Sequence, residues 1–169
     1  MQVVSVGTPP LSALKAFGEV LAAQVAVTAL LSKAQLPSPS YAFNKDRNQY
    51  HCTPILRRLQ LLIDDSTFVL GVADVDLFIP DSPFVFGEAD REARAAVISV
   101  FRLGQSAPPE TLERRLSGEA LHQTGHLLGL SNCEDLRCAM YLATSVAECD
   151  RRTFALCNLC RNELAKLRR

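Results

Sequence analysis

Two groups of potential metal ligands follow one another between residues 119 and 160 of this 169-residue chain. The first is a pair of histidines, His122 and His126, followed by Gly129. Helical residues four apart project from one face, so two imidazoles with this spacing can reach one zinc ion. The spacing therefore predicts a two-histidine metal site on a helix. A pair of ordinary surface histidines is the alternative.

The residue after the first histidine decides what chemistry such a site can perform. In the helical His-Glu-x-x-His motif of zinc proteases it is a glutamate that acts as the general base. Here it is Gln123. A carboxamide can hydrogen-bond to water but cannot take its proton at neutral pH. Glu119, one helical turn earlier, could take over the base role, but a solvated surface glutamate is the simpler interpretation.

The second group consists of cysteines in two closely spaced pairs: Cys133 and Cys138, then Cys157 and Cys160. Two such pairs joined by a longer loop are typical of a structural zinc site, in which four thiolates form a closed tetrahedral shell. The site would hold segment 133–157 against the last helix and add to folding stability. Four buried thiols without metal are the alternative. The two remaining cysteines, Cys52 and Cys149, are expected to be core or loop thiols.

Composition limits the partners and the compartment. Apolar residues make up 48% and charged residues 21% of the chain, and its formal net charge is zero. This is typical of a soluble globular protein and gives no positive surplus for nucleic acid. The apolar stretch 20–31 is too short and too polar to span a membrane, and residues 1–7 are not expected to form a signal peptide because they lack a positively charged start. We expect one compact domain, residues 1–169, in the cytoplasm, with neither nucleic acid nor a membrane as partner.

The elements that must position these residues follow from hydrophobic spacing and turn signals. Strands are expected at 2–6, 25–31, 68–79, 84–86 and 95–101. Continuation of the preceding helix is the alternative for 25–31. Helices are expected from Leu11, from Pro54 after a Thr53 cap to about Asp64–Ser66, from Pro108–Pro109 to Gly129, and from Arg151 or Cys157 to the C-terminus. Two carboxylates, Asp74 and Asp76, fall on one side of a strand and are expected to cap its end rather than bind metal.

The order of these residues resembles the archaemetzincins, a branch of the metzincin clan of zinc metalloproteases. The family pattern is His-Glu-x-x-His-x-x-Gly-x-x-His-Cys, then x4-Cys-x-Met and, after a spacer, Cys-x-x-Cys. Here it corresponds to His122, His126, Gly129, Cys133, Cys138, Met140, Cys157 and Cys160. The resemblance implies an α/β fold with a mixed, largely parallel sheet. It implies an active-site helix beneath the edge strand within residues 1–129, and a zinc-bound helical segment within 130–169.

The resemblance also assigns roles. His122 and His126 correspond to two ligands of the catalytic zinc, Met140 to a turn beneath it, and the four cysteines to a second, structural zinc. Gln123 stands in place of the base and Asn132 in place of the third histidine, and asparagine is a poorer zinc ligand than imidazole. We expect one structural zinc and no firmly held catalytic ion. Two hypotheses follow: a weak zinc metalloprotease acting on peptides, or a pseudoprotease that binds or regulates a peptide or protein partner.

Overall fold

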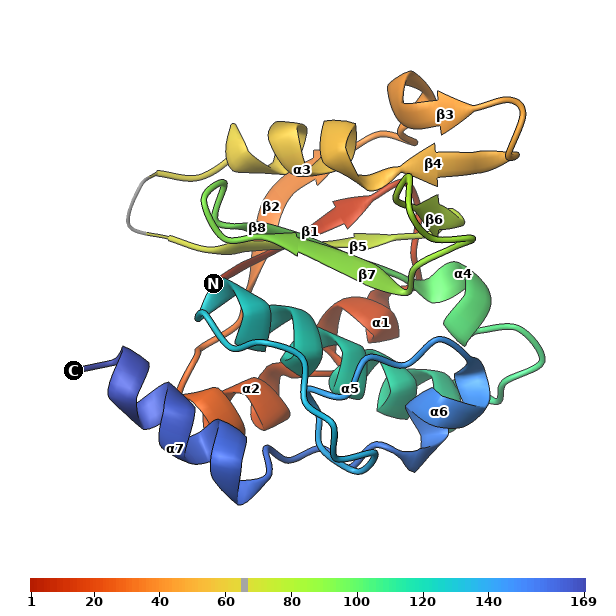
Figure 1. Cartoon of the computed structure of the whole chain (residues 1–169). Coiled ribbons are helices and arrows are strands. Elements are labelled where there is room, and N and C mark those ends of the chain that lie inside the picture. The colour runs from red at the N-terminus through yellow and green to blue at the C-terminus, as the bar shows by residue number, and fades with distance from the viewer. Residues whose placement is uncertain (65–66) are drawn as a thin grey trace.

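The computed structural model describes residues 1–64 and 67–169 and is organised around a five-stranded sheet (Figure 1). Its strand order is β2-β1-β5-β8-β7. Four strands run parallel: β1 (Gln2–Val6), β2 (Leu30–Leu36), β5 (Val69–Ala73) and β8 (Ala95–Ser99). The edge strand β7 (Gly87–Asp90) pairs antiparallel with β8. The prediction of a mixed, largely parallel sheet is therefore confirmed.

A smaller sheet lies beside one end of the large one. It has the order β3-β4-β6 and consists of β3 (Phe43–Asn44), β4 (Gln49–His51) and β6 (Leu77–Phe78). A single turn of 3-10 helix, Ser40–Ala42, precedes it. Because β5 and β6 follow one another in the chain but belong to different sheets, the segment between them connects the two sheets.

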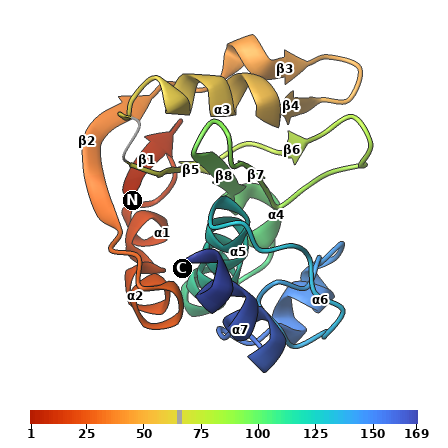
Figure 2. The ribbon, with the colours of Figure 1, turned by 60° about the vertical axis from the view of Figure 1, so that its left-hand side comes forward.

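The central strands are buried on both faces, which explains their continuous runs of Val, Ile, Leu and Ala. Alternate residues enter two cores: Leu70 and Ile98 belong to one, and Val69 and Val97 to the other. Helix α3 (Cys52–Gln60) covers one face. Helices α1 (Leu11–Lys15), α2 (Gly18–Val25) and α5 (Pro109–Leu127) cover the other (Figure 2).

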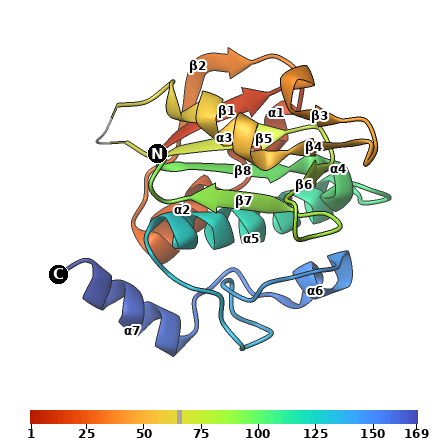
Figure 3. The same ribbon diagram turned by 45° about the horizontal axis from the view of Figure 1, so that its top comes forward.

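Helix α5 is the long helix that the histidine spacing predicts, and it packs beneath β7 and β8. It follows the short α4 (Val100–Leu103) and has a proline at its first position. Gly129, just after its end, has φ +97°, the left-handed conformation that ends a helix and turns the chain. The remaining segment, with α6 (Val146–Arg151) and α7 (Asn158–Leu167), lies on the side of α5 away from the sheet (Figure 3).

Several boundaries differ from the predictions near the N-terminus. The helix that begins at Leu11 is interrupted at Phe17, whose backbone (φ −116°, ψ 1°) leaves the helical region, so that two helices result. The strand expected at 25–31 is β2, which begins only at Leu30, because left-handed Ala26 ends α2 first. Helix α3 begins at Cys52, so Thr53 lies inside it and does not cap it. Asp65 and Ser66, expected near its end, lie outside the described residues.

The predictions for the middle of the chain also need correction. The long strand expected at 68–79 is divided into β5 and β6. The strand expected at 84–86 is displaced to β7, which begins at Gly87. Helix α6 is an additional helix, because the sequence predicts none between Gly129 and Arg151. No helix among the described residues is both long enough and apolar enough to cross a membrane.

Candidate metal centres and cleft

The two histidines of α5 converge on one point. Their Nε2 atoms lie 3.1 Å apart. The Nδ1 atom of His122 lies 2.9 Å from the carbonyl oxygen of Ala139, and that of His126 lies 2.8 Å from the carbonyl oxygen of Leu130. Because a carbonyl only accepts hydrogen bonds, each Nδ1 must donate, and this leaves both Nε2 lone pairs facing each other. Imidazoles oriented in this way are arranged as two ligands of a shared ion.

Burial keeps the first of these histidines neutral. His122 is 2% exposed. Burial lowers its pKa to about 4, although the neighbouring Glu119 carboxylate opposes this change. A neutral imidazole is the form that binds a metal ion, so His122 is ready to act as a ligand at pH 7. The alternative of ordinary surface histidines is wrong for His122.

Gln123 occupies the position of the general base and is held by a buried carboxylate. Its Nε2 donates to Glu119 Oε1 at 2.8 Å, and Arg152 Nη2 donates to Glu119 Oε2 at 2.7 Å. Glu119 is only 3% exposed, so the interpretation of a solvated surface glutamate is wrong. Burial alone would raise the pKa of Glu119, but the positive charge of Arg152 and the hydrogen bonds from Arg152 and Gln123 outweigh it and lower that pKa. An ionised, fully engaged carboxylate is poorly suited to replace the missing base.

Among the described residues, no third His, Cys, Asp or Glu side chain joins the histidine pair in a metal-binding cluster. Asn132 lines the same cleft as His122, Gln123 and His126. Within residues 1–64 and 67–169, the only cluster of three or more His, Cys, Asp or Glu side chains arranged to hold a metal ion is the cysteine group. His51 stacks on Phe78 and is not among the cleft-lining residues. The histidine pair therefore offers two imidazole ligands, and Asn132 is the candidate in the same cleft for a third, weaker one.

Met140 fills the space beneath the histidine-bearing turn of α5. It is fully buried, and a Cβ atom at Gly125 would lie 2.3 Å from its sulfur. The absence of a side chain at Gly125 thus admits the methionine. Backbone carbonyls of this turn contact both candidate centres. The Ala139 carbonyl orients His122, and the Met140 carbonyl accepts a hydrogen bond from the Cys133 N–H at 2.8 Å.

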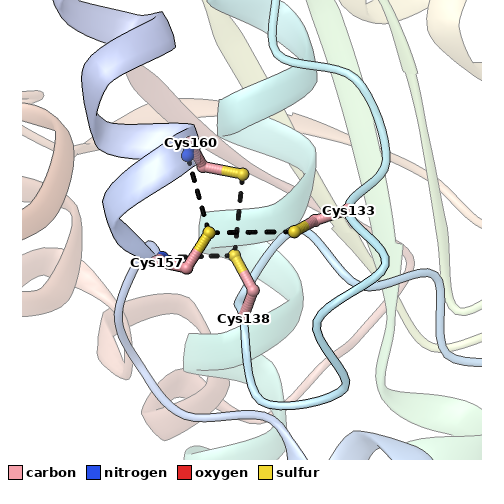
Figure 4. A group of neighbouring side chains, drawn as sticks. All are labelled: Cys133, Cys138, Cys157 and Cys160. Carbon is pink, nitrogen blue, oxygen red and sulfur yellow. Dashed lines mark hydrogen bonds between the residues drawn. The ribbon is translucent and has the colours of Figure 1, made fainter.

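The four cysteines predicted as a group are brought together between the loop after α5 and the start of α7 (Figure 4). Their sulfurs all lie within 4.8 Å of one another, and none forms a disulfide. The N–H of Cys160 points at Cys157 Sγ and, more than any other cause, lowers the pKa of that thiol to about 7. Burial raises the pKa of Cys138. Four convergent sulfurs suit a tetrahedral zinc ion. Cys52 and Cys149 are buried elsewhere, as expected.

A cleft of about 470 Å³ lies over the histidine pair. Its walls come from segment 79–86, strand β7, helix α5 and segment 142–144. Ser99 donates its N–H to the Phe86 carbonyl, and the antiparallel register continues from there. Alternate residues of β7 therefore bond to β8, while the backbone groups of Gly87 and Ala89 turn toward the outer edge. An extended peptide can pair with such an edge.

Comparisons with known proteins show the family. The model of "Peptidase family M54" matches residues 19–166. The chain is 37% identical over 155 residues to the archaemetzincin of Methanocaldococcus jannaschii, covering 89% of this chain and 82% of that one.

This chain belongs to peptidase family M54. A solved archaemetzincin from Methanopyrus kandleri superimposes with a TM-score of 0.87 at 31% identity, covering 99% of this chain and 94% of that one. A zinc-dependent peptidase from Methanocorpusculum labreanum gives a TM-score of 0.86 at 26% identity, covering 96% and 98%. The predicted archaemetzincin resemblance and fold are both confirmed. As a member of a metallopeptidase family, the chain is expected to hold metal, and its cysteine cluster could bind an ion.

Sequence reasoning missed the partners of two site residues in this archaemetzincin homologue. Arg152, 33 residues beyond Glu119, is 5% exposed and forms the buried ion pair with it. Gly87 lies against Gln123, and a Cβ atom there would lie 3.0 Å from the Gln123 amide nitrogen. The charge of Arg152 and the small size of Gly87 can be read from the sequence. The sequence separation of either residue from α5 gives no sign that it contacts this helix.

Proposed function

We propose that this protein is an archaemetzincin-type zinc metallopeptidase with an impaired catalytic centre. The observation that carries this proposal is the hydrogen bond from the Gln123 amide to the Glu119 carboxylate. An amide held by a buried anion stands where the base of an active enzyme would be, and the amide of Asn132 is the third candidate ligand beside the histidine pair.

The two candidate centres differ in how well they suit zinc. Cys133, Cys138, Cys157 and Cys160 supply four sulfurs, and we propose that they hold one structural ion. His122 and His126 supply only two imidazoles, so an ion there would be held weakly. When bound between the histidines, zinc would polarise a peptide carbonyl and acidify water.

This chain's own residues contribute binding and orientation. A peptide extended along β7 would hydrogen-bond with the outward backbone groups of Gly87 and Ala89. The Gln123 amide can orient a water molecule through its oxygen but cannot accept a proton. Loss of general-base catalysis alone lowers the rate by about 10²–10⁴-fold. The proposed ligand is a peptide or protein segment, and six cysteines without a disulfide favour a reducing compartment such as the cytoplasm.

A pseudoprotease is the second candidate. It is favoured by the complete engagement of Glu119, whose two oxygens are occupied by Gln123 and Arg152, so that no substitute base is offered within α5. In this case the cleft would bind a peptide without cleaving it.

Zinc content tests the metal assignment. Elemental analysis of the purified protein should give one zinc per chain. The ion should remain after His122→Ala and be lost after Cys157→Ser, because four thiolates bind zinc more tightly than two imidazoles and an amide. Two firmly held ions in the unaltered protein would contradict the impaired centre.

Hydrolysis separates the two candidates. Slow cleavage of quenched fluorescent peptides, abolished by His126→Ala, supports the impaired peptidase. Peptide binding without cleavage supports the pseudoprotease. The double variant Gln123→Glu, Asn132→His should raise both the zinc content toward two and the rate of cleavage. If it does neither, these two residues are not the cause of the impairment.

A further inference from the structure

Residues 79–86 form one wall of the cleft and are called the lip below. Six of the eight line the cleft: Ile79, Ser82, Pro83, Phe84, Val85 and Phe86. Within the lip, Phe84 and Phe86 pack edge to face with centroids 5.2 Å apart. Two backbone contacts tie the lip to the sheets: the isolated bridge of Val85 with Leu77, and the hydrogen bond from the Ser99 N–H to the Phe86 carbonyl. Both hold the end of the lip next to β7, so the position of the preceding residues, 80–84, depends largely on side chains from elsewhere.

Two side chains of the β3–β4 hairpin bind the lip backbone. Arg47 Nη2 donates to the carbonyls of Ser82 and Pro83. Gln49 Nε2 also donates to the Pro83 carbonyl, at 3.0 Å. Arg47 is itself fixed, because its Nε donates to Gln49 Oε1 at 3.0 Å and its guanidinium lies 4.2 Å above the Phe78 ring.

A buried carboxylate connects this hairpin to α4. Asp76 is 9% exposed and accepts a hydrogen bond from Gln49 Nε2 at 3.1 Å. Arg102 donates to both oxygens of Asp76, at 2.6 and 2.7 Å. The same guanidinium lies 4.0 Å from the centroid of Phe84. The planar Arg102 side chain is thus clamped on Asp76 and covers one face of the aromatic ring that lines the cleft.

We propose that Arg47, Gln49, Asp76 and Arg102, called the brace, are positioning residues that fix the lip and make the cleft selective for a peptide with an aromatic or long aliphatic side chain. The brace sets the orientation of Phe84, and Phe84 is the surface that such a side chain contacts. This inference rests on the proposed peptide-binding function. It adds to that function a class of ligand and four residues that do not touch the ligand.

Conservative variants test the brace without leaving a buried charge unpaired. Arg102→Lys keeps the positive charge beside Asp76 but removes the bidentate hydrogen bonds to Asp76 and the planar contact with the Phe84 ring. The double variant Asp76→Asn, Arg102→Met removes both charges together. Arg58→Lys is the matched control. Arg58, on α3, also lies over an aromatic ring, 3.6 Å from the centroid of Tyr41, but neither residue lines the cleft.

Binding would be measured by fluorescence anisotropy with fluorescein-labelled octapeptides that carry Phe, Leu, Ala or Asp at one central position. The unaltered protein and the Arg58→Lys control should bind the Phe and Leu peptides about 10-fold or more tighter than the Ala peptide, as expected for one well-packed apolar side chain. In Arg102→Lys this preference should fall below about 3-fold, a change that general destabilisation would not produce. Amide hydrogen exchange should accelerate in 79–86 and remain unchanged in β5 and β8.

An unchanged preference in both brace variants would overturn the proposal, and so would unchanged exchange in the lip. If no peptide binds the unaltered protein, the proposed function fails and the selectivity fails with it. Hydrogen exchange still reports in that case whether the brace holds the lip, so the two failures can be distinguished.

Discussion

Gln123 carries an amide where a glutamate would carry a carboxylate. This difference removes the general base, and it also determines how Gln123 interacts with the neighbouring Glu119. The Gln123 amide donates a hydrogen bond to the Glu119 carboxylate, which is buried and ion-paired with Arg152. A glutamate at position 123 would place two carboxylates where an amide and a carboxylate now form a hydrogen bond. Restoring the base therefore introduces repulsion between like charges.

The variant Gln123→Glu should lose stability in a pH-dependent manner. Of two carboxylates in contact, one has its pKa raised in the folded state above the unfolded value. A raised folded pKa favours folding at low pH and penalises it as the pH rises through that pKa. We expect a loss of about 2–4 kcal/mol at pH 8 and a clearly smaller loss at pH 5, measured by urea unfolding.

The exchange variant Glu119→Gln, Gln123→Glu is the control, because it keeps one amide and one carboxylate in contact. Its stability should depend on pH in nearly the same way as that of the unaltered protein. Arg152 would then lie beside an amide, so recovery of the full stability is not expected. If Gln123→Glu lowers the free energy of unfolding by the same amount at pH 5 and at pH 8, the two carboxyl groups are not in contact.

At the scale of elements, α5 does more than carry two histidines at helical spacing. Its Gly125 lets Met140 approach the helix closely, and the carbonyl before Met140 orients His122. The methionine turn and α5 are therefore packed as one unit, and the orientation of His122 depends on the contact between them.

The variant Gly125→Ala should test this contact. Alanine favours a helix over glycine by about 1 kcal/mol, but the new Cβ atom would meet the Met140 sulfur at 2.3 Å. Overpacking of this kind costs about 1–3 kcal/mol, so we expect a net loss of free energy of unfolding. The double variant with Met140→Ala should lose less than the sum of the two single variants, because the new methyl group partly fills the vacated space.

Gly18→Ala provides a matched control. Gly18 begins helix α2, and a Cβ atom there meets nothing within 4 Å. This substitution should be neutral or stabilising. A Gly125→Ala variant that behaves like Gly18→Ala in thermal unfolding would show that Met140 can move aside without cost.

At the scale of the whole molecule, the cysteine cluster connects the C-terminal segment to the loop that leaves α5. Cys133 and Cys138 come from this loop, and Cys157 and Cys160 come from the start of α7. A metal ion bound by all four would join parts of the chain about 20 residues apart, so its removal should affect α7 more than the sheet.

Zinc binding should be linked to proton release and to order in the C-terminal segment. The hydrogen bond from the Cys160 N–H lowers the pKa of Cys157 to about 7, whereas burial raises the pKa values of Cys138 and Cys160. Because zinc binds thiolates, binding at pH 7 should release about three to four protons per ion, measured by calorimetry in buffers of different ionisation enthalpy. Chelation should accelerate hydrogen exchange in 133–167 and leave β1, β5 and β8 protected. Release of one proton or none would mean that fewer thiols bind the ion.

The sequence by itself determined the residues with local signatures. Helix α5 and its end at Gly129, the positions of His122 and His126, and the cysteine pairs were all predicted, because each depends on helical period, close spacing or a local helix-ending residue. The resemblance to the archaemetzincin pattern identified Gln123 and Asn132 as departures from it.

Only the tertiary structure decided what surrounds those residues. The burial of Glu119, its pairing with Arg152, the division of 68–79 into β5 and β6, and the brace beneath the lip all bring together residues that are distant in the chain. Such contacts are set by how helices and sheets pack, and no local pattern in the sequence records them. The sequence therefore identifies the candidate metal ligands. The residues that fix the protonation and position of these ligands can be identified only from the folded structure.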